Sequence, residues 1–178
     1  VNVHGVIKVS QAFLPLMHRR DGRDGQPGII MHIGSVSGTF ATPFLGPYCA
    51  SKYALEAISD CMRRELAPMG IRVVLLQPAS VHSAIWDKAM QARTYAEGTT
   101  YEGLHDHKER IIRRAARSAM DTSRVTRVVW RVATGRARRP RYLITRSNLL
   151  YKIFRMLPDG WLDIIFSRQI SQLQAPPG

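Results

Sequence analysis

Two short apolar runs with a helical segment between them constrain the fold more than any other feature of this chain. Residues 28–34 form an apolar run bounded by glycines, and residues 71–76 are apolar at every position but one. Both runs have the length of buried strands. Apolar side chains recur at a helical period over 48–67, and Pro68 and Gly70 end that helix. Two almost wholly apolar strands joined by a helix predict a right-handed parallel crossover, and hence an α/β fold.

Further elements extend this pattern on both sides. Apolar residues recur at helical spacing over 3–18, and a helix is predicted over 124–134, followed by a third strand at 141–144. The more polar segment 84–120 leaves the carboxyl end of a predicted strand, which is where ligands bind in open α/β sheets. We therefore expect 84–120 to act as a substrate lid, although a segment without such a role fits the pattern nearly as well.

Basic side chains are concentrated in the second part of the chain. The 178 residues carry a formal net charge of +13, and 45% of them are hydrophobic, which excludes a disordered chain. Residues 1–107 contain 10 basic and 9 acidic side chains, whereas residues 108–178 contain 16 and 4. The first part is electrically balanced, and the second part raises the question of an anionic partner.

Cysteine spacing and terminal composition suggest a cytoplasmic protein. Cys49 and Cys61 lie about 18 Å apart if the segment between them is helical, too far for a disulfide bond. Unpaired thiols fit a reducing compartment. The sequence contains neither a signal peptide pattern nor a membrane-spanning apolar run. Because residue 1 is Val1, we expect the chain to belong to a longer protein.

One group of polar residues is a candidate catalytic site. Tyr48 opens the predicted helix, and Lys52 follows four residues later on the same helix face. A phenol is a poor base at neutral pH, but a neighbouring cation favours the phenolate form and so assists general acid–base chemistry. Ser35 follows the first strand and can donate a hydrogen bond to a substrate oxygen. This spacing alone also occurs by chance on solvated helices.

The wider context of these residues closely resembles the short-chain dehydrogenases/reductases. The resemblance lies in GSVSG at 34–38, GPYCASKYALE at 46–56 and RELAPMGIRV at 64–73, and Tyr48 follows Ser35 by thirteen positions, as in that family. NVHG at 2–5 is similar to the family segment that carries a catalytic asparagine. The resemblance is dense over residues 1 to about 85 and implies the second half of a Rossmann-type, doubly wound parallel sheet with about three strands.

The resemblance also implies roles for individual residues. Tyr48 would be the general acid/base, Ser35 would polarise the substrate oxygen, and Lys52 would assist Tyr48 and hold the nicotinamide ribose. Asn2 would position a water that links Lys52 to solvent. The remaining candidates for binding NAD or NADP follow the second strand, where Ala79 and Ser83 replace the Gly and Thr usual in the family. The full set of implied cofactor-binding residues is Tyr48, Lys52, Pro78, Ala79, Val81 and Ser83.

A nucleotide-binding segment typical of this family is missing from the sequence. The chain contains neither G-x-x-x-G-x-G nor G-x-G-x-x-G, the turns that bind a cofactor pyrophosphate. We therefore interpret residues 1–146 as the second half of a short-chain dehydrogenase domain. The edge of the strand at 29–34 would then be unpaired and prone to aggregation. We expect this polypeptide alone to bind a dinucleotide weakly, and an inactive interaction or membrane-surface module is the alternative reading.

The tail and the basic clusters leave several partners open. Residues 147–178 predict two short amphipathic helices that could pack on the fold, contact another subunit or lie on an anionic membrane. The tail resembles those of enzymes that act on retinoids, steroids or other lipidic alcohols, which implies an apolar alcohol or ketone substrate. In the family, helices such as 3–18 and 48–67 commonly form homo-oligomers.

Two other kinds of partner have weaker support. Arginines 110–117 and 136–141 lack the aromatic residues and motifs of nucleic-acid binding, so we expect solvated faces there. No metal site is predicted, because His105 and His107 have no further ligands at suitable spacing.

Overall fold

The computed structural model describes residues 1–17, 28–91 and 105–171. The chain divides into two compact units, the first formed by Val1–Ala79 with Thr122–Arg146 and the second by Ser80–Asp121 with Ser147–Gly178. Each unit is described by itself below. All three strands belong to the first unit.

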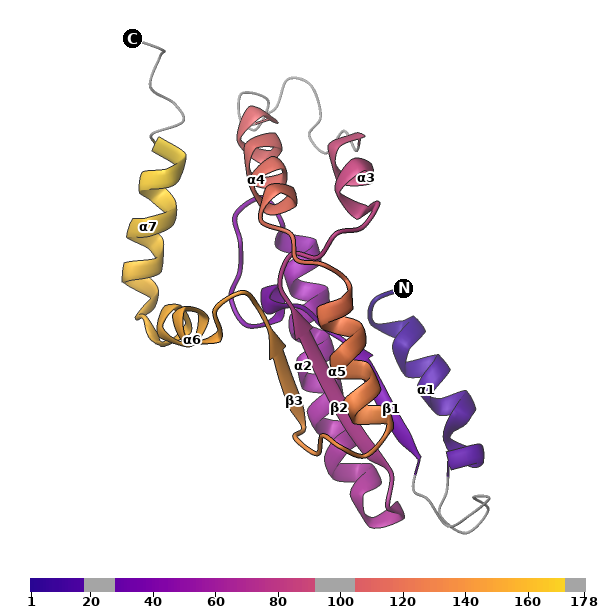
Figure 1. The fold of residues 1–178 in the computed structure, drawn as a ribbon. Helices are drawn as coiled ribbons and strands as arrows, with labels where there is room; N and C mark the ends of the chain where they lie inside the picture. Colours follow the sequence, from indigo (N-terminus) through magenta and orange to yellow (C-terminus); the bar gives the residue numbers. More distant parts are fainter. Residues whose placement is uncertain (18–27, 92–104, 172–178) are drawn as a thin grey trace. The chain divides into compact units, whose positions relative to one another are not determined.

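The first unit is built on a three-stranded parallel sheet in the order β1-β2-β3 (Figure 1). In β1 and β2, Ile29 is opposite Arg72 and Ile33 is opposite Leu76. Within the described residues, β2 is the only strand that pairs with β1, so β1 forms an edge of the sheet, as the sequence predicted. The strands are β1 (Ile29–Ile33), β2 (Arg72–Pro78) and β3 (Arg141–Ile144). The helices of this unit are α1 (His4–Met17), η2 (Val36–Gly38), α2 (Gly46–Leu66), η3 (Ala67–Met69) and α5 (Ser123–Ala133).

Side-chain contacts show which helices share a face of the sheet. His32 on β1 bonds to one serine of α1 and one of α2, and Gln77 on β2 and Arg141 on β3 both bond to Glu56 of α2. Helices α1 and α2 therefore cover the same face. Helix α5 covers the opposite face (Figure 1). Because both faces are covered, the middle five residues of β2 are all buried, which explains its nearly uniform apolar sequence.

A network of ion pairs and hydrogen bonds attaches α2 to β2 and β3. The Arg141 guanidinium donates to Glu56 Oε2 at 3.2 Å and to Asp60 Oδ1 at 2.8 Å. The amide of Gln77 donates to the other Glu56 oxygen at 2.7 Å. The hydrogen bond from Arg141 lowers the pKa of Asp60 below its usual value. Arg141 thus binds α2 to the sheet, whereas Arg138 and Arg139, close to it in the sequence, are exposed.

The described residues of the second unit form four helices, two of which lie in the segment that was predicted to be a lid. They are α3 (Ile85–Gln91), α4 (His105–Arg117), α6 (Asn148–Met156) and α7 (Asp159–Ser171). The central part of that predicted lid, residues 92–104, lies outside the described residues. Backbone bonding anchors its two ends to each other, because Val81 pairs with Met120 in an isolated parallel bridge.

The α/β class and the parallel sheet predicted from the sequence are confirmed. The third strand has the predicted bounds, 141–144, and α2 begins two residues earlier than predicted, at Gly46. Cys49 is buried, Cys61 is exposed, and both thiols are free. In the described parts of the chain, none of the helices combines the length and the apolar character needed to cross a bilayer.

Candidate active site

The first turns of α2 present the two residues on which the site is built. Pro47 lies in the first turn, where its missing N–H costs nothing and its fixed φ favours the helix. Tyr48 and Lys52 follow one turn apart and therefore lie on the same helix face. The Lys52 ammonium nitrogen lies 5.8 Å from the centroid of the Tyr48 ring, which is a cation–π distance. The positive charge is thus next to the phenol, as the spacing predicted.

Lys52 also connects α2 to the end of β1. Its Nζ donates a hydrogen bond to the carbonyl oxygen of Ile33 at 2.9 Å. Burial lowers the pKa of Lys52 below its usual value, because desolvation disfavours the charged form. The single bond to Ile33 leaves two of the three ammonium protons for other acceptors. A half-buried cation with unused donors is suited to binding a hydroxyl-rich ligand.

Ser35 lies two residues beyond Ile33 and is buried. Its hydroxyl oxygen caps η2 by accepting the Ser37 backbone N–H at 3.1 Å. That bond uses a lone pair of the oxygen, so the hydroxyl proton can still be donated to another group. The Ser35 hydroxyl therefore keeps the hydrogen-bonding capacity that the sequence prediction requires.

Close packing holds the Ser35 turn on α2. A Cβ at Gly38 would lie 2.8 Å from the carbonyl oxygen of Lys52 and 3.1 Å from Glu56 Cγ. Only glycine allows this approach of two backbones. At the other end of the turn, the Gly34 amide donates to the Leu76 carbonyl at 2.8 Å. The turn is therefore fixed to both β2 and the helix that carries Tyr48 and Lys52.

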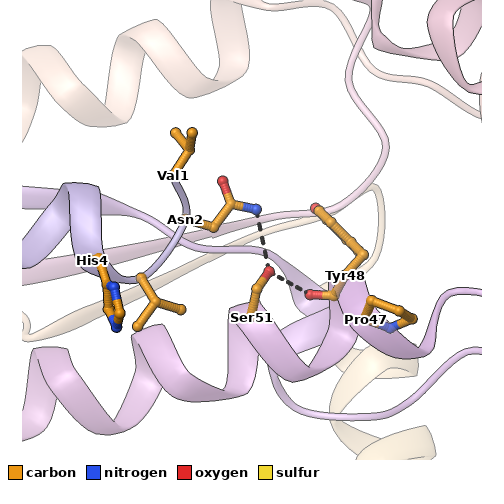
Figure 2. A pocket seen from close by; sticks show the side chains of 7 residues that line it. Val1, Asn2, His4, Pro47, Tyr48 and Ser51 are labelled. Atoms are coloured by element: carbon orange, nitrogen blue, oxygen red, sulfur yellow. Dashed lines mark hydrogen bonds between the residues drawn. The ribbon is translucent and has the colours of Figure 1, made fainter.

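Asn2 reaches the start of α2 through a serine. Its side-chain amide donates to Ser51 Oγ at 3.2 Å, and Ser51 in turn donates to the Tyr48 carbonyl oxygen at 2.7 Å (Figure 2). Asn2, Tyr48 and Ser51 line a surface pocket of about 570 Å³ together with Pro47 and the first residues of the chain. The structure thus brings Asn2 to the tyrosine's helix turn.

A second hollow connects Asn2 with Lys52. It has a volume of about 520 Å³ and is lined by residues of α1 and β1. Apolar side chains of both elements line most of it, with Asn2 and Lys52 among the polar residues. Asn2 therefore borders both hollows, one shared with Tyr48 and the other with Lys52.

The predicted cofactor-binding turn after β2 is divided between the two units. Pro78 and Ala79 belong to the first unit, where the Ala79 amide donates to the Ile144 carbonyl at 2.9 Å. Pro78 ends β2 as Ile33 ends β1, so both lie at the carboxyl edge of the sheet, as Ser35 does. Val81 and Ser83 belong to the second unit. There the Val81 carbonyl accepts the Trp86 indole N–H at 2.9 Å, and Ser83 is exposed.

Two parts of the site were not anticipated from the sequence. Ser51 links Asn2 to Tyr48, and the Ile33 carbonyl is an acceptor for Lys52. A hydroxyl three residues after Tyr48 could have suggested the first link, since helical serines commonly bond to a carbonyl one turn back. No side-chain pattern marks a carbonyl acceptor, so the second contact had no signal.

No set of three His, Cys, Asp or Glu side chains is arranged to bind a metal ion in the described residues. The side chains of His105 and His107 lie outside them.

Comparison with known proteins decides the family. The family model described as short chain dehydrogenase matches residues 1–94. The chain belongs to this family of oxidoreductases. The match contains Asn2, Ser35, Tyr48 and Lys52 and also spans the turn after β2.

Relatives of the chain are longer than the chain itself. An NADPH-dependent 3-dehydrocapnine reductase from Ornithobacterium rhinotracheale is 29% identical over 174 residues, covering 97% of this chain and 61% of the relative. Human retinol dehydrogenase 16 is 30% identical over 179 residues, covering 93% and 54%. The chain thus spans about three fifths or less of these relatives' lengths.

Solved structures support the fold. A short-chain dehydrogenase/reductase from Burkholderia phymatum in complex with NAD superposes with a TM-score of 0.70, over 100% of this chain and 58% of that chain, at 24% identity. The Rossmann-type α/β fold predicted from the sequence is therefore confirmed.

Proposed function

We propose that the protein interconverts an alcohol and a carbonyl compound with NAD or NADP, and that Tyr48 is its general acid/base. The observation that carries this proposal is the Lys52 ammonium lying 5.8 Å from the Tyr48 ring centroid, one helical turn away. The cation stabilises the phenolate that forms when Tyr48 gives up its proton. General acid–base catalysis of this kind contributes about 10²- to 10⁴-fold in rate.

Proton transfer in the reducing direction begins at the Tyr48 hydroxyl. The hydroxyl gives its proton to the carbonyl oxygen of the substrate, and in the oxidising direction the phenolate takes the proton from the alcohol. The Ser35 hydroxyl donates a hydrogen bond to the same oxygen and stabilises the negative charge that develops there. A bound NAD or NADP supplies or accepts the hydride at the neighbouring carbon.

Asn2 contributes to proton movement as a positioning residue. Its bond to Ser51 fixes it beside the Tyr48 turn, and it borders the hollow that also contains Lys52. In our proposal Asn2 orders a water between Lys52 and solvent, so that the proton lost by Tyr48 is replaced from outside. The exposure of Asn2 is consistent with such an outlet.

The residues of this chain fit the nicotinamide end of the cofactor. Tyr48 and Lys52 offer a hydroxyl and an ammonium with unused donors to the ribose hydroxyls. Pro78 and Ala79 at the carboxyl edge of the sheet, followed by Val81 and Ser83, are proposed to contact the nicotinamide. The sequence contains no Gly-rich pyrophosphate turn, so we expect the 178-residue chain to bind the mononucleotide half about as well as the dinucleotide.

An apolar alcohol or ketone is the proposed substrate class. Relatives named as a retinol dehydrogenase and as a 17-beta-hydroxysteroid dehydrogenase support this class.

We also propose a cytoplasmic homo-oligomer formed through α1 and α2. Val9, Phe13 and Leu16 on α1 are apolar and more than half exposed, which supports an interface on that helix.

The function is tested by joining the chain, ahead of Val1, to the part of the 3-dehydrocapnine reductase that this chain does not cover. The fusion is assayed with retinol and with hydroxysteroids, using both NAD and NADP. We expect turnover that falls at least 100-fold in Tyr48→Phe and remains in Tyr53→Phe, which changes an exposed tyrosine on the same helix. Equal turnover in the two variants would refute the role of Tyr48.

Nicotinamide mononucleotide provides a test on the 178-residue chain itself. Saturation-transfer NMR should detect binding of this half-cofactor, and Lys52→Met should weaken it. Binding that Lys52→Met leaves unchanged would argue against the proposed ribose contact. Micromolar binding of a whole dinucleotide, followed by fluorescence titration, would contradict the expectation of weak dinucleotide binding.

A further inference from the structure

Helix α6 exposes an apolar face. Its exposed apolar residues have exposed fractions between 52% and 83% and are Leu149, Leu150, Ile153 and Met156. At about 100° per residue these four side chains fall within an arc of about 120°. Helices of globular proteins normally turn such an arc toward the core. The arc therefore marks an interaction surface rather than a packing face.

The opposite side of α6 is the one that packs. Tyr151 and Phe154 are half-buried, and the Phe154 ring meets the Phe166 ring of α7 edge to face, with centroids 6.2 Å apart. Ser147 caps the helix by accepting the Leu150 amide. These contacts fix the rotation of α6 about its axis, so its exposed arc is a defined surface.

The charges on α6 identify the chemistry of its partner. The helix contains Lys152 and Arg155 and no acidic residue. At about 100° per residue Lys152 falls beside Met156 at the border of the arc, whereas Arg155 falls about 100° beyond Met156, on the other side of the helix. An apolar face bordered by cations is the pattern of helices that lie in the headgroup region of a membrane. Lysine and arginine side chains there reach up to anionic headgroups while their stems stay on apolar surface.

Helix α7 repeats the pattern. Trp161 and Ile164 are 63% and 51% exposed, and Arg168 follows at a spacing that puts all three on one face. Tryptophan is enriched at membrane–water interfaces, because its ring is apolar and its N–H is polar. Asp159 and Asp163 fall on the opposite side of α7 at about 100° per residue, so the exposed face of α7, like that of α6, combines apolar side chains with a cation.

A second copy of this chain fits the surface less well. A two-fold contact between α6 helices through this arc would bring the Lys152 side chains of both copies to the same contact, with no acidic side chain on the helix to balance them. We propose that α6 and α7 dock onto the surface of an anionic lipid bilayer, with Leu149, Leu150, Ile153, Met156 and Trp161 in the headgroup region. The formal net charge of +13 over the whole chain adds a long-range attraction to an anionic surface.

The proposal is tested by co-sedimentation of the 178-residue chain with vesicles. The vesicles are pure phosphatidylcholine or phosphatidylcholine with roughly 30% phosphatidylserine, which gives the surface a negative potential. We expect binding to the anionic vesicles only, weakened by added salt. Equal binding to the neutral vesicles, or none to the anionic ones, would overturn the proposal.

Variants separate docking by this surface from general attraction of a basic protein. Leu149→Gln with Met156→Gln should lower the partition coefficient about tenfold or more, and Lys152→Gln about fivefold, whereas Arg155→Gln on the other side of the helix should have a smaller effect. Trp130→Gln serves as the control, because Trp130 is an equally exposed tryptophan on α5. All these side chains are exposed, so the variants should fold, which thermal unfolding checks. Unchanged binding of the Leu149/Met156 variant would overturn the proposal.

Two further measurements distinguish other occupants. Brominated lipid in the anionic vesicles should quench tryptophan fluorescence in Trp130→Phe and much less in Trp161→Phe, and equal quenching in both would contradict docking through α7. In lipid-free solution, light scattering should give the same mass for the wild type and the Leu149/Met156 variant. A wild-type dimer that becomes a monomer in the variant would assign the surface to a second copy instead.

Discussion

The Lys52 ammonium lies 5.8 Å from the centroid of the Tyr48 ring and donates a 2.9 Å hydrogen bond to the carbonyl oxygen of Ile33. One side chain therefore connects the proposed acid/base to the strand that leads to Ser35. The cation stands beside the phenol because a helix places residues four apart on one face. The bond to β1 then keeps the ammonium nitrogen from turning out to solvent.

Replacing Lys52 should change the pH dependence of the proposed activity. Burial lowers the pKa of Lys52, so its charge is lost at a pH below the usual 10.5. Activity that needs the cation should therefore decline on the alkaline side before that pH. In the fusion protein, Lys52→Arg should extend activity to higher pH because a guanidinium stays charged, while Lys52→Met should lose about 100-fold or more at all pH values. An alkaline limit that is identical in wild type and Lys52→Arg would contradict this reading.

Gly38 should tolerate no side chain, because the η2 turn packs on the backbone of α2. A Cβ there would lie 2.8 Å from the Lys52 carbonyl oxygen, so the two elements must separate. We expect Gly38→Ala to lower the free energy of unfolding by about 1–3 kcal/mol. Gly46→Ala is the matched control, since no heavy atom lies within 4 Å of a Cβ at that position. Urea unfolding measures both, and equal stability would show that the turn does not need this close approach.

The sequence predicted the elements that depend on local pattern. The strand bounds at 141–144 and the helix that carries Tyr48 and Lys52 follow from apolar periodicity and from the breakers Pro68 and Gly70. The placement of Tyr48 beside Lys52 follows from helix geometry alone.

Contacts between distant residues carry no such pattern. Arg141 was grouped with a solvated basic cluster, but it bonds to Glu56, 85 positions away. His32 bonds to side chains 22 and 27 positions away, on two different helices. Helix α3 was also missed, because residues 84–120 are polar and irregular, and α4 was indicated only by arginines that recur at helical spacing over 110–117.

Removing Arg141 from its ion-pair network should lower the free energy of unfolding only modestly. Arg141→Met removes both donors and leaves Glu56 hydrogen-bonded to Gln77. We expect a loss of about 1 kcal/mol in the free energy of unfolding, limited because the Arg141 side chain is 35% exposed. Arg138→Met changes an exposed neighbour and should have little effect. Chemical denaturation at neutral pH compares the two, and equal losses would mean that the network adds nothing specific.

Lowering the pH should weaken the same network, because Asp60 becomes protonated. Arg141 lowers the pKa of Asp60 below the usual 3.8, so the stabilisation is present above that pH and is lost as pH falls through the lowered value. Wild type should therefore lose stability relative to Arg141→Met between these two pH values, and the two curves should converge at more acidic pH. Parallel curves for the two proteins would show that Asp60 does not titrate as proposed.

His32 should make the first unit sensitive to mild acid. It is buried on β1 with Nδ1 2.8 Å from Ser59 Oγ and Nε2 3.3 Å from Ser10 Oγ. Ser59 already donates its proton to the Leu55 carbonyl, so Nδ1 carries the imidazole hydrogen and Nε2 accepts from Ser10. Both ring nitrogens of the neutral imidazole are therefore hydrogen-bonded. Protonation at Nε2 would place its N–H against the hydroxyl hydrogen of Ser10 and break that hydrogen bond.

Burial lowers the pKa of His32, so the unfolded chain takes up a proton at a higher pH than the folded one. As the pH falls below the usual value of 6.5, the free energy of unfolding should therefore decrease by up to about 1.4 kcal/mol per pH unit. The decrease should stop once the pH falls below the pKa of His32 in the folded protein. His32→Asn should be less stable at pH 7 but should lose this slope, whereas His4→Asn, which changes an exposed histidine on α1, should keep it. Urea midpoints measured from pH 7.5 to 5 test the prediction, and a slope that persists in His32→Asn would assign the acid sensitivity to another group.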